Sequence, residues 1–326
     1  ETEIRLLIAV SAIAALIIQT VPAAGSGHSM ATGENGWTVD PIFTTGESVS
    51  GYTPPGVIDG LGAYELDNDT VRVFANHELL HFRGYPYEVS DGAGGTFSLN
   101  GARISYFDID KDTRTVVDGG LAINTIYDAN GAIATDLSFQ PNGLAGFSRF
   151  CSGSLFESHE FGAKRGLEDR IFFAGEEDGG FFSPVGGGEW ALDPETGNLW
   201  HLPDLGRGAW ENVTILDTGR KDTVAVILAD DTSPFDFGGQ PGDEAAPLFL
   251  YVGEKDPDGD FPAQNGLRGG DLYVWVANNG ASSPADYNGS GKLAGQWVQI
   301  DNSPTGPASN DGSTGFDNFG YPTQGT

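Results

Sequence analysis

Short hydrophobic runs recur along the chain from about residue 30, and each is bounded by Gly, Pro, Asp or Asn. Runs of this length that are rich in β-branched and aromatic residues predict β-strands. The predicted strands are Val71–Ala75, Ile104–Phe107, Arg170–Ala174, Trp190–Leu192, Val224–Leu228, Leu248–Val252, Asp271–Val276 and Gln296–Ile300. No long segment of this part has the apolar spacing of an amphipathic helix, so we predict an all-β fold.

Several of these runs pair across recognisable turns. A turn at 110–112 joins two runs, and a second turn at 193–198 contains Pro194, which presets φ, and Gly197, which accepts a positive φ. Strand–turn–strand units over the whole length favour a β-propeller over residues 26–326, with a β-sandwich as the second choice. No strict repeat consensus is visible in the sequence.

Two acidic stretches resemble calcium loops but are predicted to be turns. Asp256, Asp258 and Asp260 alternate with other residues, but Gly259 comes too early for a helix–loop–helix calcium loop and no helix flanks the stretch. We predict a surface turn there, and a hairpin turn at 108–112.

The N-terminal segment has a different composition. Arg5 precedes a 13-residue apolar run, Leu6–Ile18, and small residues follow at 22–25. This pattern is typical of a secretory signal peptide, and a retained anchor is the alternative for residues 1–25. We therefore expect a secreted, periplasmic or extracellular protein that contacts a membrane only if this segment is retained. The sequence has no initiator Met and ends in a Gly/Thr-rich stretch, so we expect a fragment with a propeller that is incomplete at the C-terminus.

Charge narrows the classes of partner. The chain has 16 Lys and Arg against 46 Asp and Glu, a formal net charge of −30. Such a chain repels phosphate backbones, so nucleic acid is excluded as a partner. An acidic surface suits divalent cations, although solubility in salt alone also explains it.

Five predicted strand ends carry a carboxylate or a thiol. They are Glu78 in VFANHE, Cys151 in FSRFCSGS, Glu177 in IFFAGEED, Glu211 in LGRGAWEN and Asp231 in VILADD. In a propeller, strand ends gather around the central channel, and converging carboxylates repel each other unless a cation lies among them. A solvated turn explains any one of them, but the five together predict a metal site.

Cys151 is the only cysteine, so an internal disulfide is excluded. A lone thiol is often a small core residue, but the Ser and Gly neighbours here indicate a turn. A thiolate ligand among carboxylates would indicate a transition metal, whereas a nucleophile would need His77 or His159 as a base. Arg149 is the candidate catalytic residue, because it would lower the thiol pKa or bind an anionic substrate.

The order of these motifs resembles the PhoX-type alkaline phosphatase family. The order is NHE, an isolated Cys in a Ser/Gly turn, GEE, LGR followed by a Glu, and DD. The resemblance begins near Asn76 and is strongest over Phe147–Val276, including WALDPETGNLW. It implies a β-propeller that is a secreted phosphomonoesterase with an iron pair and calcium ions, and a small phosphate monoester as substrate.

The resemblance also implies roles for individual residues. Cys151 would be the thiolate ligand of iron, and Glu78, Glu177 and Glu211 would be carboxylate ligands of iron or calcium. Asp231 would be a calcium ligand.

The chain departs from the family pattern at three places. Trp210 stands where the family has His before Glu211, the segment 156–169 is longer, and no Arg-Pro-Glu motif is present. In the family, the Arg of that motif binds phosphate. Two alternatives therefore stay open: a non-catalytic extracellular calcium-binding propeller, and a calcium-dependent hydrolase of the lactonase type. The lactonase alternative predicts calcium without iron and indifference to the loss of Cys151.

Overall fold

The computed structural model describes residues 31–140, 144–178, 186–231, 247–281 and 291–300. Their regular structure is almost entirely strand, which confirms the all-β prediction. The exceptions are the four-residue helix α1 (Phe261–Gln264) and the 3₁₀ turns η1 (Leu137–Phe139) and η3 (Pro203–Leu205). No helix within the described ranges is long and apolar enough to cross a membrane.

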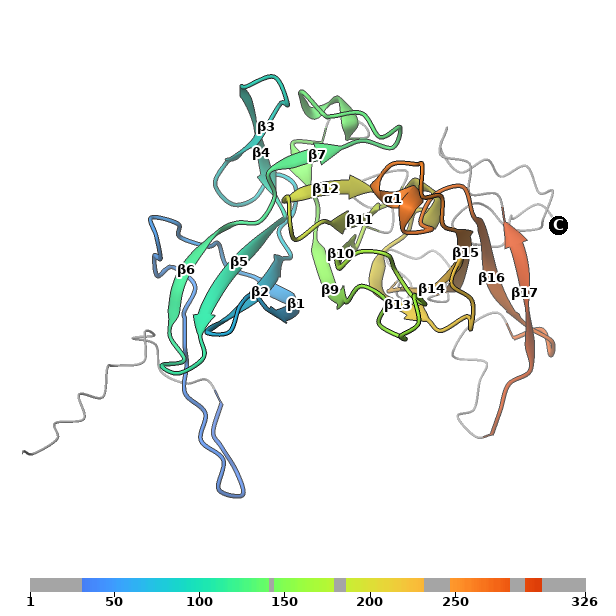
Figure 1. The fold of residues 1–326 in the computed structure, drawn as a ribbon, viewed down its shortest axis with the longest axis horizontal. Helices are drawn as coiled ribbons and strands as arrows, with labels where there is room; N and C mark the ends of the chain where they lie inside the picture. Colours follow the sequence, from blue (N-terminus) through green and yellow to red (C-terminus); the bar gives the residue numbers. More distant parts are fainter. Residues whose placement is uncertain (1–30, 141–143, 179–185, 232–246, 282–290, 301–326) are drawn as a thin grey trace, which may run out of the picture.

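The strands form three sheets that lie side by side (Figure 1). The first has the order β1-β2-β5-β6, the second β8-β4-β3-β7-β12-β11-β10-β9 and the third β13-β14-β15-β16-β17. Their bounds are β1 (Ile58–Glu65), β2 (Thr70–His77), β3 (Tyr87–Ser90), β4 (Thr96–Gly101), β5 (Arg103–Asp110), β6 (Val116–Leu121), β7 (Thr125–Tyr127), β8 (Gly146–Phe147), β9 (Phe150–Phe156), β10 (Ile171–Glu176), β11 (Glu189–Leu192), β12 (Asn198–His201), β13 (Trp210–Leu216), β14 (Thr223–Asp230), β15 (Leu248–Glu254), β16 (Asp271–Ala277) and β17 (Gly295–Ile300).

Strand β10 of the second sheet is buried on both faces, which explains why its sequence is almost continuously apolar. Successive side chains of a strand point to opposite faces. Phe172 packs against Phe74 of the first sheet, with ring centroids 5.3 Å apart, while Phe173 joins Phe249 in the core shared with the third sheet. Full burial of each such ring contributes roughly 1.5–3 kcal/mol.

One edge strand from each of the three sheets lies at the middle of the molecule. Strand β9 lies between β1 and β13, and all three lie near the centre of Figure 1. The approach of β1 to β9 depends on Gly60, because a Cβ there would lie 1.8 Å from the backbone nitrogen of Gly153. Only a glycine fits that contact, so the two sheets come together with their backbones nearly touching.

The predicted hairpins are confirmed. Strands β5 and β6 pair antiparallel around a turn that begins after Asp110, so residues 108–110 belong to β5 and not to the turn; β11 and β12 pair around Gly197, which has φ 72°. The Asp256–Asp260 stretch is also a turn: Asp256 accepts a hydrogen bond from the backbone of Asp258, and Asp260 caps α1 and pairs with Arg268.

The remaining expectations about architecture are not decided. Three open sheets lie side by side, and none of them is closed on itself in the part of the chain described. A closed propeller therefore stays a prediction. The predicted signal or anchor at 1–25 lies outside the described residues, as does the C-terminal end.

Candidate metal centre

The candidate site is built from one structural unit that occurs three times. In each sheet one edge strand pairs antiparallel with the strand that follows it in the chain, giving the strand pairs β1–β2, β9–β10 and β13–β14, whose members are called the first and second strand of the pair. The second residue of each first strand is Asp59, Cys151 or Glu211. The residue directly after each second strand is Glu78, Glu177 or Asp231, respectively.

The three strand pairs share one backbone hydrogen bond and one bulge around these six residues. The N–H groups of Glu78, Glu177 and Asp231 donate to the carbonyls of residues 57, 149 and 209, at 2.8, 2.9 and 2.8 Å. Each first strand also carries one extra residue just after its first position, so the register shifts there. Such β-bulges redirect side chains and are frequent beside functional sites. The shared bulge explains why equivalent positions face the middle of the molecule.

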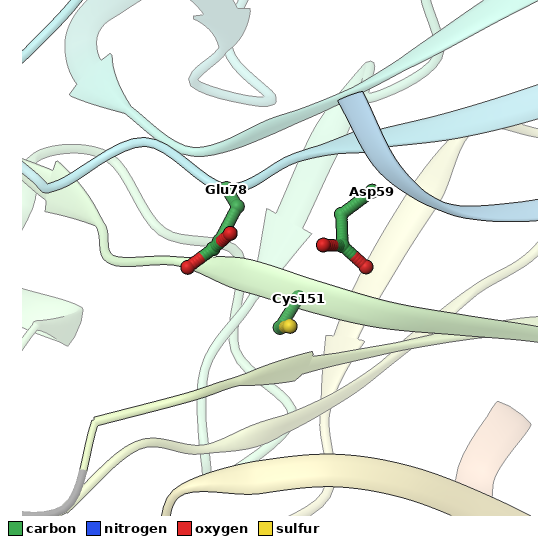
Figure 2. A group of neighbouring side chains, drawn as sticks. All are labelled: Asp59, Glu78 and Cys151. Atoms are coloured by element: carbon green, nitrogen blue, oxygen red, sulfur yellow. The ribbon is translucent and has the colours of Figure 1, made fainter. Parts of the chain in front are cut away.

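Five of the six side chains form two overlapping triads. Ligand atoms of Asp59, Glu78 and Cys151 lie within 4.8 Å of one another, and so do those of Cys151, Glu177 and Glu211. Figure 2 shows the first triad, with both carboxylates next to the sulfur of Cys151. Because Cys151 belongs to both triads, its thiol lies at the centre of the group.

Burial favours the neutral, protonated form of most of these groups over the charged form. Cys151 is 7% exposed, and burial raises the pKa of its thiol, with a further rise from hydrogen bonding to Glu211 and from the charge of Glu177. Burial also raises the pKa values of the Asp59, Glu177 and Glu211 carboxyls. The net change in the thiol pKa is a rise, so a lowering of this pKa by Arg149 is not seen, and its role toward an anionic substrate stays a prediction. A bound cation would favour the negative forms of all these groups.

Arg149 lies between the two triads and binds a carboxylate from each. Its Nε donates to Glu78 at 2.9 Å, and its Nη2 lies 2.8 Å from Glu78 and 2.5 Å from Glu177. Its Nη1 donates to the backbone carbonyl of Glu177 at 3.1 Å. All three nitrogens of the guanidinium group are therefore bonded to the residues predicted to hold metal.

The remaining predicted residues lie at the margin of the site or outside it. Asp231 is exposed and interacts electrostatically with Glu211, but it belongs to neither triad. The His77 ring bonds to Gly56 and Ser105, and His159 pairs with Glu168. Neither histidine is placed as a base for the thiol, so the nucleophile alternative has no support here.

Each acidic pair divides into an inner and an outer carboxylate. Glu176, directly before Glu177, is buried and accepts hydrogen bonds from Ser148, Gly188 and Trp190 at 3.0 to 3.1 Å. Asp230, directly before Asp231, is also buried and accepts from the backbone of Ala209 at 2.9 Å. The first acid of each pair therefore holds the strand end in place, whereas the second is Glu177, a member of a triad, or Asp231 at the margin of the site.

Sequence reasoning missed Asp59. It lies in VIDGLG, upstream of the stretch that resembles the phosphatase family. The signal that could have found it is the internal repeat: FANHE and FAGEE end equivalent second strands, so their first strands should also supply equivalent residues.

The donor set fits a metal centre of mixed type. Two ligands of one ion bound at 2.0–2.6 Å are at most about 5 Å apart, and the spacing in both triads meets this limit. A thiolate selects transition metals such as iron, whereas carboxylates alone suit calcium. Cys151 would hold the transition metal, and Asp59, Glu78, Glu177 and Glu211 would supply oxygen ligands.

Comparison with known proteins gives little beyond this geometry. No protein-family model and no curated protein sequence matches the chain. PhoX from Pseudomonas fluorescens, solved with the transition state analogue vanadate, is similar with a TM-score of 0.43 and 14% identity, over 74% of this chain and 48% of that chain. The chain thus spans about half the length of that protein. The β-1,2-mannobiose phosphorylase of Listeria innocua, solved with β-1,2-mannobiose, has a TM-score of 0.33 and 8% identity, over 78% and 77% of the two chains. Similarities this low carry no argument about function.

Proposed function

We propose that the protein is a secreted, metal-dependent phosphomonoesterase of propeller fold that hydrolyses small phosphate esters at an iron and calcium site. The observation that carries the proposal is the convergence of Cys151 with Glu78, Glu177 and Glu211, four residues that the sequence resemblance had selected as ligands. The order of the sequence motifs supports the reaction class.

The residues of the chain would divide the work as follows. Cys151 would hold the transition metal, and the surrounding carboxylates would supply oxygen ligands. When bound, such ions offset the charge of phosphate oxygens and lower the pKa of bound water. Arg149 contributes fixed positive charge beside that position, and the buried Glu176 keeps the end of β10 in place.

The first test is metal analysis of the purified protein, wild type beside Cys151→Ser. We expect iron and calcium in the wild type and loss of iron in the variant. Hydrolysis of p-nitrophenyl phosphate should disappear in chelator and return when iron and calcium are restored. Calcium alone, unchanged by the substitution and without phosphatase activity, would contradict the proposal.

One observation favours a non-catalytic calcium-binding protein as a second candidate. Arg149 is bonded through all three guanidinium nitrogens to Glu78 and Glu177, which leaves it little capacity to hold a phosphate group. Stabilisation by calcium without hydrolysis of any phosphate ester would favour this candidate.

A further inference from the structure

Arg149 combines two properties that the proposed catalytic role does not explain. It is bonded to one carboxylate of each triad, Glu78 and Glu177, at 2.5 to 2.9 Å. It also places a permanent positive charge inside a group whose other charged members are acids, with its side chain only 31% exposed. A cation that binds to either triad would have to share a carboxylate with Arg149 or displace the arginine from it.

The internal repeat shows that the charge is specific to the middle strand pair. The residues equivalent to Arg149 are Val57 and Ala209, because all three accept the N–H of the residue after the second strand. Both equivalents are apolar. The fold therefore does not require an arginine at this position.

The backbone conformation of position 149 does not depend on the arginine, because one apolar equivalent adopts it too. Arg149 has φ 55° and the equivalent Val57 has φ 56°, both in the left-handed region that non-glycine residues rarely adopt, whereas Ala209 of the third strand pair does not have a positive φ. The backbone N–H of Arg149 donates to Leu79 at 2.8 Å, and its carbonyl accepts from Glu177 at 2.9 Å. These bonds hold the residue between the first and second sheets whatever its side chain is.

We propose that Arg149 is a counter-ion within the site: its guanidinium group neutralises the carboxylates in place of a metal ion until one binds. It offsets the repulsion among carboxylates, so the three first strands can come together in the metal-free protein. It also competes with the incoming cation for Glu78 and Glu177, and so sets how tightly the site binds metal. This inference rests on the proposed metal site and not on the phosphatase reaction.

The test is calcium titration of metal-free protein by calorimetry, together with the melting temperature with and without calcium. Arg149→Gln keeps hydrogen-bonding capacity but removes the charge. We expect its metal-free form to melt at a lower temperature and to gain more on calcium addition. Its calcium affinity should be at least about threefold tighter, the size expected for loss of a partly exposed ion pair.

A second variant and a matched control make the result specific. Arg149→Lys keeps the positive charge but loses the planar guanidinium group with its several N–H donors. Its calcium affinity should therefore lie between those of the wild type and Arg149→Gln. It also serves as the test if Arg149→Gln does not fold. Arg165→Gln is the control, because Arg165 is equally exposed and pairs with Asp217 at 2.6 Å outside the two triads.

Three results would overturn the inference. Unchanged calcium affinity with weaker binding of inorganic phosphate would make Arg149 a substrate ligand only. Weaker calcium affinity in Arg149→Gln would show that the arginine positions the carboxylates for the ion. A wild type that binds no calcium would remove the metal site itself, and with it the proposed function, whereas the first two results leave that function standing.

Discussion

Glu189 on β11 is a buried acid outside both triads. Glu189 is 1% exposed, and its Oε1 has no hydrogen-bond partner among the described residues. Burial and the nearby Glu176 raise the pKa of its carboxyl well above the ordinary value. The folded state therefore keeps a proton that the unfolded chain releases, so stability falls as pH rises above the ordinary carboxyl pKa of about 4.3.

The fall in stability with rising pH predicts the effect of Glu189→Gln. The amide removes the cost of the buried carboxyl, so the variant should be more stable than the wild type by about 1 kcal/mol or more at pH 8. The two proteins should be nearly equal at pH 4. Urea unfolding in excess chelator measures this, and Glu195→Gln, at a side chain 77% exposed, is the control. An equal difference at both pH values would contradict the assigned cause.

At the scale of elements, the contact of β1 with β9 can be tested without touching a ligand. Gly60→Ala would place a Cβ 1.8 Å from the backbone of Gly153, so the strands must separate. Overpacking of this kind costs about 1–3 kcal/mol. We also expect calcium binding to weaken, because Asp59 and Cys151 lie beside the contact. Gly56→Ala is the matched control, because its Cβ would meet no atom within 4 Å; equal calcium affinity in the two variants would contradict the prediction.

The same scale shows what the sequence could predict. Strands and hairpins followed from apolar runs and turn residues, and the 193–198 turn is an example. The convergence of four predicted ligands could be predicted because acids and a thiol directly at strand ends are visible in the sequence. Asp59 was not predictable from local pattern, since its place beside Cys151 depends on a bulge and on the Gly60 contact between two sheets. The bonding of Arg149 to two predicted ligands was equally invisible.

At the scale of the whole molecule, the net charge of −30 predicts strong self-repulsion. Raising NaCl shortens the Debye length from about 10 Å at 0.1 M to about 3 Å at 1 M. In chelator, the melting temperature should therefore rise steadily with NaCl. Calorimetry in chelator over this range checks the effect apart from any bound cation. A melting temperature that stays constant or falls would show that surface repulsion is not limiting stability.

The three strand pairs present one backbone with different chemistry at one position. Asp59, Cys151 and Glu211 occupy that position, so a single soft donor stands between two hard ones. The three positions have the same place in their strand pairs, and only the sulfur at the buried middle one selects a different class of metal. Exchanging the two side chains, Asp59→Cys with Cys151→Asp, would move the thiolate ligand, and with it the preference for a transition metal, to the edge of the group.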